Sequence, residues 1–308
     1  MYFAKVIVNP TARGGAAGRT WPFVHKLLKN TGLNFDADFI QKSGQGIELA
    51  RNAVEKGYNL VIAFGGDGTV NEVVNGLVDE NGKGRATLGI IGAGTQNDIA
   101  RMLNIPWDYI RACQLFEGFK KTTIDLGAVE YTFHNQKARR YYINTAGVGF
   151  VADVIESSTA NFKLKAIGGG VPYAIGLMPR ILSLSNKDLL ISIDGELHKE
   201  RNFSLVVNNG RYLGGGRVFP DATPYDGLLD VAILGDLSKL EALLDFPFFY
   251  TGTNTNLPKI KMQKARNVTV DSIQKIPMQI DGELIGETPA TFRVIPFALQ
   301  VAVKNSQR

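Results

Sequence analysis

A glycine-rich turn in the first quarter of the chain carries the residues best suited to phosphate chemistry. Gly65-Gly66-Asp67-Gly68-Thr69 follows a short apolar run and opens a helical pattern. Glycines let a backbone approach a ligand closely, and the N-terminus of a helix presents N–H groups that suit phosphate. An aspartate would repel bare phosphate, but it can hold a divalent cation that in turn binds phosphate. The alternative is an ordinary strand-to-helix turn capped by Thr69.

Two further turns of small residues also follow apolar runs. They are Asn9-Pro10-Thr11-Ala12-Arg13-Gly14-Gly15 and Gly92-Ala93-Gly94-Thr95-Gln96-Asn97-Asp98. The carboxyl ends of parallel strands meet at one edge of an open sheet, where ligands bind, so we expect the three turns to converge. Commoner phosphate motifs are missing from the sequence: it has no G-x-x-x-x-G-K-[ST], and the turn at 92–97 lacks the third glycine of G-x-G-x-x-G.

The elements that must position these turns alternate between strand and helix. Short strands are expected at 3–8, 35–40, 60–64 and 87–91, with helical patterns near 21–28, 47–56, 69–78 and from 97. This alternation predicts an α/β domain with a mostly parallel sheet over residues 1–127.

A different pattern begins near residue 126, where strand-like runs follow one another. One of these runs is 141–145, and turn pairs such as Asp194-Gly195 and Asp281-Gly282 separate them. The pattern predicts an all-β sandwich over residues 128–295. The simplest interpretation of Lys137, Arg139 and Arg140 is a solvated turn.

Composition excludes several classes of protein. The chain has 308 residues, 44% of them hydrophobic, so two domains can bury sufficient core without disulfides. The single cysteine, Cys113, cannot form an internal disulfide, which is typical of the reducing cytoplasm. No run approaches about 18 apolar residues, so we expect no transmembrane span. The net charge of +5 is spread evenly, which argues against nucleic acid and suits an anionic nucleotide or membrane leaflet.

Taken in order, the motifs resemble those of the diacylglycerol-kinase catalytic-domain family, which includes bacterial soluble lipid kinases and sphingosine kinases. The matching segments are Asn9-Pro10, 65–73, 92–101, 122–127, 144–150, 214–216, 220–222, 226–230 and 281–283. The resemblance implies a nucleotide domain like that of phosphofructokinases and NAD kinases, formed by residues 1–127, to which residues 296–308 can return. It also implies that the β-sandwich at 128–295 binds the lipid substrate.

The resemblance further implies that the γ-phosphate of ATP is transferred, with Mg²⁺, to a lipid hydroxyl. The residues it assigns to the nucleotide are Asn9, Pro10, Thr11, Gln41, Gly65, Gly66, Asp67, Gly68, Thr69, Asn71, Glu72, Gly94, Thr95 and Asn97. It assigns the catalytic magnesium to Asp67, Asp98 and Asp125. It also implies a structural cation bound by Asp226 and by the carbonyl groups of Thr223 and Leu228. Two departures are Ala12-Arg13-Gly14, where the family has a Ser-Gly or similar pair, and Gln41, where a threonine is common.

Two carboxylates near the C-terminus are candidates for the base that takes the proton of the lipid hydroxyl. The resemblance assigns this role to Asp281 or Glu283. From the residues alone, Asp281-Gly282 is equally well interpreted as a type I′ hairpin turn, since Asp-Gly is a common pair there. The same tripeptide occurs earlier, as Asp194-Gly195-Glu196. Only the position of Asp281-Gly282-Glu283 in the order of the motifs favours it as the site of the base.

Two rival functions use the same turn. An NAD kinase-like enzyme would share it, but the segments 122–127 and 226–230 favour the lipid kinases. A non-catalytic nucleotide- or lipid-binding protein is the second rival, and it would not need four acids in Asp67, Asp98, Asp125 and Asp281. The sequence does not specify the lipid: diacylglycerol, phosphatidylglycerol, a polyprenol, a monoacylglycerol and a sphingoid base all carry the required hydroxyl.

A basic and apolar segment at 162–184 suggests how a lipid is reached. Lys163, Lys165 and Arg180 are interspersed with apolar residues, as in helices that lie on anionic membranes, although a helix packed on the sandwich fits equally well. We therefore expect a cytoplasmic protein that is peripheral at the inner membrane surface and reaches a membrane lipid there. A homodimer is the default assembly.

Overall fold

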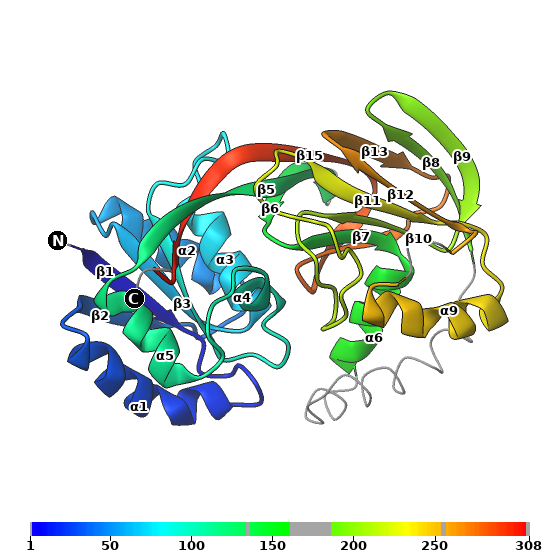
Figure 1. The fold of residues 1–308 in the computed structure, drawn as a ribbon. Coiled ribbons are helices and arrows are strands. Elements are labelled where there is room, and N and C mark those ends of the chain that lie inside the picture. Colours follow the sequence, from blue (N-terminus) through cyan, green and yellow to red (C-terminus); the bar gives the residue numbers. More distant parts are fainter. Residues whose placement is uncertain (1, 134–135, 161–185, 254–256, 306–308) are drawn as a thin grey trace. The chain divides into compact units, whose positions relative to one another are not determined.

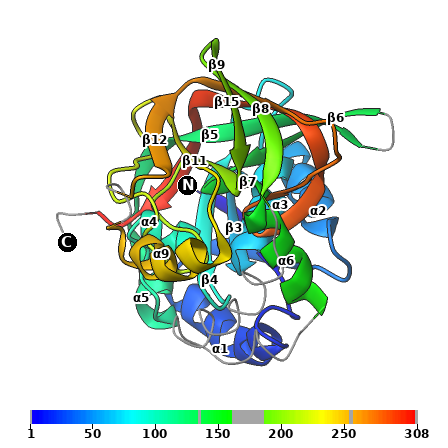
Figure 2. The same ribbon diagram turned by 90° about the vertical axis from the view of Figure 1, so that its right-hand side faces the viewer.

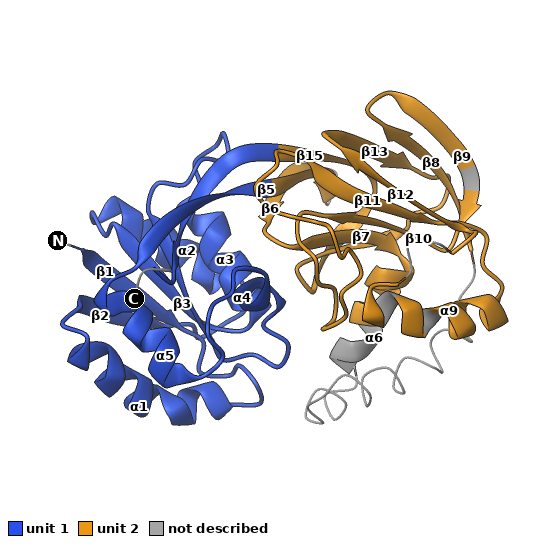
Figure 3. Ribbon diagram, viewed as in Figure 1, with its two compact units in different colours: residues 1–126, 295–308 blue, residues 127–294 orange. Residues whose placement is uncertain are grey.

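The computed structural model describes residues 2–133, 136–160, 186–253 and 257–305. The chain folds into two compact units (Figure 3). Unit 1 comprises residues 1–126 and 295–308, and unit 2 comprises residues 127–294. The segment 162–184, for which we expect a basic helix, lies outside the described residues. Within the described residues, no helix is long and apolar enough to cross a membrane.

Unit 1 is built on a parallel sheet (Figure 1). Its strands are β1 (Phe3–Val8), β2 (Asn34–Phe39), β3 (Leu60–Gly65) and β4 (Thr87–Gly92), in the order β4-β3-β1-β2. The C-terminal end of β15 (Glu283–Val303) adds a parallel strand beside β4, with Val301 opposite Leu88. All six residues of β3 are buried, as expected for a parallel strand covered on both faces.

Helices cover the sheet of unit 1. They are α1 (Ala16–Asn30), α2 (Gln45–Glu55), α3 (Asp67–Leu77), α4 (Asp98–Met102) and α5 (Tyr109–Gln114), followed by the 3-10 turn η1 (Leu115–Glu117). Helix α1 packs against α5, and α2 packs against α3. Gly76 of α3 permits the second contact, because a Cβ there would lie 2.3 Å from the carbonyl oxygen of Ile47 in α2.

Unit 2 consists mainly of β-strands. One path of antiparallel neighbours runs β12-β11-β10-β7-β14-β15. Its further members are β7 (Thr145–Gly149), β10 (Ser204–Asn208), β11 (Leu229–Leu234), β12 (Ile260–Ala265) and β14 (Pro277–Ile280). The remaining strands form two branches from β15, one through β5 to β6 and the other through β13 and β8 to β9. They are β5 (Lys120–Phe133), β6 (Gln136–Tyr142), β8 (Lys187–Ile193), β9 (Glu196–Asn202) and β13 (Asn267–Asp271).

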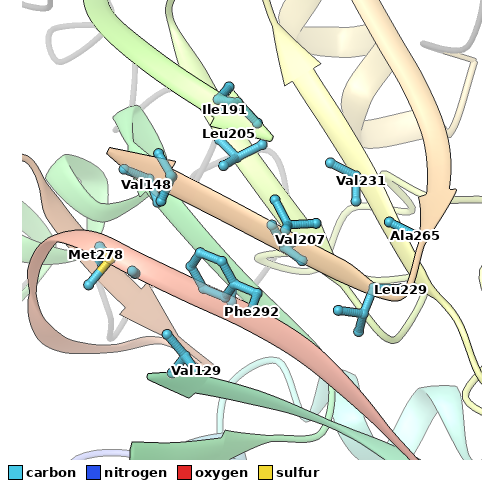
Figure 4. Packing of buried hydrophobic residues seen from close by; sticks show 14 of the residues in the cluster. Val129, Val148, Ile191, Leu205, Val207, Leu229, Val231, Ala265, Met278 and Phe292 are labelled. Carbon is cyan, nitrogen blue, oxygen red and sulfur yellow. The ribbon is translucent and has the colours of Figure 1, made fainter. Parts of the chain in front are cut away.

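Alternate side chains of these strands form the main core of unit 2 (Figure 4). Val148 of β7, Val207 of β10 and Phe292 of β15 are fully buried in it. Successive side chains of a strand point to opposite faces, so Val206, which precedes Val207 in β10, packs in a second cluster. Helices α6 (Phe150–Ala160) and α9 (Lys239–Thr251) contribute side chains to that cluster. Figure 2 shows the two helices.

The expected fold class is confirmed, because a parallel α/β region precedes a β-rich region. Two local expectations are wrong. The run at 141–145 is split between the end of β6 and the start of β7, with a break at Ile143 and Asn144. Lys137, Arg139 and Arg140 belong to strand β6 and not to a turn, since an antiparallel pair tolerates charged side chains where it is solvated.

Candidate active site

The three turns that the sequence assigns to phosphate binding lie together in unit 1. They follow β1, β3 and β4, and β3 is the parallel neighbour of the other two strands. The second and third turns touch through their backbones, since the N–H of Ala93 donates to the carbonyl oxygen of Gly65 at 2.7 Å. A Cβ on Gly94 would lie 2.5 Å from the Cα of Gly66, so a side chain does not fit there. The turns therefore converge at the carboxyl edge of the sheet.

Asn9 ties the first turn to the second. Its amide nitrogen donates to the hydroxyl of Thr69 at 2.9 Å. Its side-chain Oδ1 accepts hydrogen bonds from the backbone N–H of Thr11 at 3.1 Å and from the Thr11 hydroxyl at 2.8 Å. Pro10 accepts the N–H of Gly18 through its carbonyl oxygen, which anchors the turn to α1. The side chain of Asn9 thus shapes the turn, while Thr11 is exposed.

Asp67 joins the second turn to the third. Its Oδ2 accepts the N–H of Asp98 at 3.1 Å, and its Oδ1 accepts the N–H of Ile99 at 2.9 Å. The carboxylate therefore lies at the first turn of α4, where unpaired N–H groups favour negative charge. Gly66, Asp67 and Gly68 are half-buried, so this part of the turn remains accessible to a ligand.

Asn97 shapes the third turn. Its carbonyl oxygen accepts the N–H of Gly94 at 2.8 Å, and its amide nitrogen donates to the carbonyl oxygen of Gly94 at 3.2 Å. Its backbone is left-handed, with φ of 51°, a conformation that asparagine adopts more readily than most residues. Thr95 lies between these two residues and is half-buried. Asn97 therefore holds the turn in which Thr95 can meet a ligand.

Glu72 is buried and binds a neighbouring loop. Its Oε1 accepts the N–H of Gly44 at 2.9 Å, and its Oε2 accepts the N–H of Gly46 at 2.7 Å. These N–H groups precede or open α2, so Glu72 fixes the start of that helix. The same loop contains Gln41, which is exposed and whose N–H donates to Oε1 of Gln45 at 2.7 Å. Asn71 is fully buried in α3 and accepts hydrogen bonds from the amide of Asn75.

Replacing Glu72 by alanine is expected to lower the free energy of unfolding by about 1–3 kcal/mol, because the buried N–H of Gly46 and the partly buried N–H of Gly44 lose a charged acceptor. Urea unfolding followed by circular dichroism measures the change. Glu48→Ala is the matched control, since Glu48 is an exposed acid in the first turn of α2. Equal stabilities of the two variants would contradict the anchoring role of Glu72.

The other two acids assigned to magnesium are also buried. Asp98 pairs with Arg101 at 3.5 Å. Asp125 is fully buried, and its Oδ1 accepts the N–H of Phe297 at 2.7 Å, which holds the returning end of β15. Within the described residues, no group of three or more His, Cys, Asp or Glu side chains is arranged to hold a metal ion. One or two carboxylates suffice for Mg²⁺, which takes its other ligands from phosphates and water, so Asp67 fits this ion.

In unit 2, the side chain of Asp281 binds the backbone at the break between β6 and β7. Its Oδ2 accepts the N–H of Ile143 at 2.9 Å, and its Oδ1 accepts those of Asn144 at 3.0 Å and Thr145 at 2.9 Å. The backbone is a type I′ turn, with φ of 43° at Asp281 and 87° at Gly282. The hairpin interpretation of this pair is thus correct, and the carboxylate has a further role in binding three backbone amides.

Glu283 lies two residues beyond Asp281 and differs from it in exposure. Asp281 is buried, whereas the Glu283 side chain is 31% exposed. The guanidinium of Arg140 lies 3.5 Å from Oε2 of Glu283. Glu283 therefore presents a carboxylate that a ligand can reach, and Asp281 presents one that supports the backbone.

Several buried polar residues near Asp281 were missed by sequence reasoning. Asn208 accepts the hydroxyl of Thr145 at 2.6 Å, and the amide of Asn209 donates to the carbonyl oxygen of Ile143 at 2.7 Å. The sequence marks this region only by the pair Asn209-Gly210, which is also common in ordinary turns. Burial raises the pKa of Tyr142 well above its usual value, and the charge of Asp281 adds to the effect. The Tyr142 phenol is therefore neutral in the folded protein.

Asp226, assigned to a structural cation, meets the ammonium group of Lys264 at 2.6 Å. Its Oδ1 also accepts the N–H of Leu228 at 3.1 Å. Asp230 lies opposite Lys264 in the β11–β12 pair, with 3.3 Å between charged atoms. Burial raises the pKa of Asp230, and Lys264 opposes that shift. Lys264 gave no signal in the sequence, and the cation site with Thr223 stays a prediction.

Family models match most of the chain. Residues 4–129 match the diacylglycerol kinase catalytic domain, and residues 146–303 match the YegS C-terminal NAD kinase beta sandwich-like domain. The chain is 30% identical to a diacylglycerol kinase of Staphylococcus saprophyticus over 303 residues, covering 98% of this chain and 95% of that protein. It is 29% identical to a diacylglycerol kinase of Staphylococcus carnosus, covering 99% and 97%. The chain belongs to the diacylglycerol kinase catalytic-domain family.

Solved structures show the same fold. A diacylglycerol kinase from Bacillus anthracis str. Sterne superposes with a TM-score of 0.73 at 21% identity, covering 99% of this chain and 97% of that one. Another structure from that organism gives a TM-score of 0.78 at 22% identity, covering 99% and 98%. The resemblance found in the motifs is thus confirmed, and relatives named as kinases support a kinase.

Proposed function

We propose that the protein is an ATP-dependent kinase that transfers the γ-phosphoryl group to the hydroxyl of a lipid, with magnesium as its metal. The observation that carries the proposal is Asp67, a half-buried carboxylate that joins two glycine-rich turns at the carboxyl ends of adjacent parallel strands. The kinase relatives support the reaction, and those relatives named diacylglycerol kinase support a lipid as acceptor.

Unit 1 supplies the nucleotide side of this reaction. The close backbones at Gly66 and Gly94 leave no side chain between the turns, and the N-terminus of α3 begins at Asp67. A helix N-terminus and small residues suit a polyphosphate. Magnesium, when bound, neutralises phosphate charge, and Asp67 is the residue of the turn that would hold it. Asn9, Asn97 and Glu72 keep the surrounding loops in place.

Unit 2 supplies the base, for which we favour Glu283 over Asp281. A base must contact the hydroxyl it deprotonates. Glu283 is partly exposed, whereas Asp281 is buried against three backbone amides. In the proposed step the acceptor oxygen bonds to the γ-phosphorus while the bond to the β–γ bridging oxygen breaks. ADP leaves with that electron pair, and the hydroxyl proton passes to Glu283.

A phosphorylation screen tests this proposal. The protein is incubated with Mg²⁺ and γ-labelled ATP, together with either a total lipid extract or NAD, and labelled products are identified by mass. Label in a lipid supports the proposal and names the acceptor. Label in NAD supports the NAD kinase-like alternative. A protein that binds ATP but labels neither substrate would be a non-catalytic binder, and the proposal would be wrong.

A further inference from the structure

An ion pair in unit 2 links strand β6 to the candidate base Glu283. The guanidinium of Arg140, in β6, lies 3.5 Å from Oε2 of Glu283, at the start of β15. The two side chains are 24% and 31% exposed, so neither is fully solvated nor enclosed in the core. Such partly exposed pairs contribute little to folding stability.

The register of β5 and β6 determines where the arginine points. Arg140 lies opposite Val129, and Arg139 lies opposite Glu130. Directly opposite residues of an antiparallel pair share one face. Val129 is a core residue, so Arg140 lies on the core side, while Arg139 lies on the other side and pairs with Glu130 through its Nε at 3.0 Å. Two consecutive arginines of one strand therefore have separate acidic partners.

Close packing between β5 and β15 brings Arg140 near Glu283. The two strands are paired in the sheet (Figure 1). Tyr131 of β5 lies against Gly286 of β15, where a Cβ would be only 2.9 Å from the tyrosine ring. A glycine at this point lets the aromatic ring rest on the backbone three residues after Glu283. The hairpin of β5 and β6 therefore packs beside the start of β15.

We propose that Arg140 is a positioning residue, which holds the side chain of Glu283 in the orientation that accepts the proton of the lipid hydroxyl. This inference rests on the proposed function and on Glu283 as its base. A glutamate has three side-chain torsions and, where partly exposed, adopts several rotamers. Arginine remains charged at every relevant pH and binds a carboxylate with directional N–H groups, so it selects among those rotamers. A misplaced base slows the chemical step more than it weakens substrate binding.

The test compares Arg140→Met and Arg140→Lys with Arg139→Met, the matched control on the opposite face. Phosphate transfer from γ-labelled ATP into total lipid extract in mixed micelles is measured, with kcat and the KM for ATP. We expect Arg140→Met to lower kcat by roughly tenfold to 100-fold while the KM for ATP changes less than about twofold. Arg140→Lys should recover part of kcat, and Arg139→Met should keep the parent kcat.

The outcomes separate this inference from the proposed function. No transfer by the parent protein overturns the proposed function and, with it, the role of Arg140. Transfer by the parent that is lost in Glu283→Gln but fully retained in Arg140→Met overturns the role of Arg140 alone. Equal losses in Arg140→Met and Arg139→Met, with lower melting temperatures for both, would show that the hairpin needs its charges only for folding. If Arg140→Met does not fold, the kcat of Arg140→Lys is compared with that of the parent and of Arg139→Met instead.

Discussion

Replacing Asp67 by asparagine is expected to reduce kcat/KM for phosphate transfer by about 100-fold or more, because the turn loses the carboxylate that would hold magnesium. The amide keeps one acceptor oxygen but turns an NH₂ group toward the N–H of Asp98 or Ile99, both of which donate to the carboxylate in the parent protein. We therefore also expect a loss of unfolding free energy of about 1–3 kcal/mol. Labelled-ATP transfer and urea unfolding measure the two effects.

Asp79→Asn is the matched control for Asp67→Asn. Asp79 also belongs to unit 1, and its Oδ1 accepts two backbone N–H groups, from Asn81 at 2.9 Å and Lys83 at 2.8 Å. It follows α3 and is not part of the glycine-rich turns. The control should lose some stability and keep its activity. An Asp67→Asn variant with the kcat/KM of the control would contradict the role given to Asp67.

The three glycine-rich turns could be predicted because their signals are local. An apolar run precedes each turn, and the alternation of strands and helices predicts parallel strands whose carboxyl ends share an edge. The hydrogen bond between Ala93 and Gly65 and the close approach of Gly94 to Gly66 agree with that prediction. Small residues in such turns carry no side chain that would block this close approach, so the composition itself indicates where two turns can touch.

The partners of Glu72 and Asp281 could not be predicted. Both carboxylates bind backbone N–H groups, which every residue except proline carries, so no side-chain pattern marks the partner. The residues that Glu72 binds are 26 and 28 positions away, and those bound by Asp281 are 136 to 138 positions away. Only the packing of α2 on α3, and the pairing of β14 with β7, bring these groups together.

The split between β6 and β7 has the same physical origin. Residues 141–145 are Tyr141, Tyr142, Ile143, Asn144 and Thr145, a composition that favours one continuous strand. In the structure, the N–H groups of the last three residues donate to Asp281. A tertiary hydrogen-bond acceptor therefore overrides the local preference. The contact between Arg140 and Glu283 also joins residues far apart in the sequence, so no local pattern predicts it.

Substitutions of Glu283 and Asp281 are expected to separate chemistry from folding. Glu283→Gln should lower kcat by about 100-fold to 10,000-fold, because the amide cannot accept the hydroxyl proton. Its free energy of unfolding should change by less than about 1 kcal/mol, since the pair with Arg140 is partly exposed. Asp281→Asn should instead lose about 2–3 kcal/mol, because three buried N–H groups lose a charged acceptor.

Asp194→Asn is the control for Asp281→Asn, because Asp194-Gly195 forms the same left-handed turn and its carboxylate accepts the N–H groups of Arg266 and Asn267. Asp194 is exposed, so water can replace the lost acceptor and the stability loss should be smaller. A stable but inactive Asp281→Asn beside an active Glu283→Gln would assign the base to Asp281. The opposite result, an inactive Glu283→Gln that melts like the parent, would separate the two carboxylates into one that reacts and one that holds the backbone.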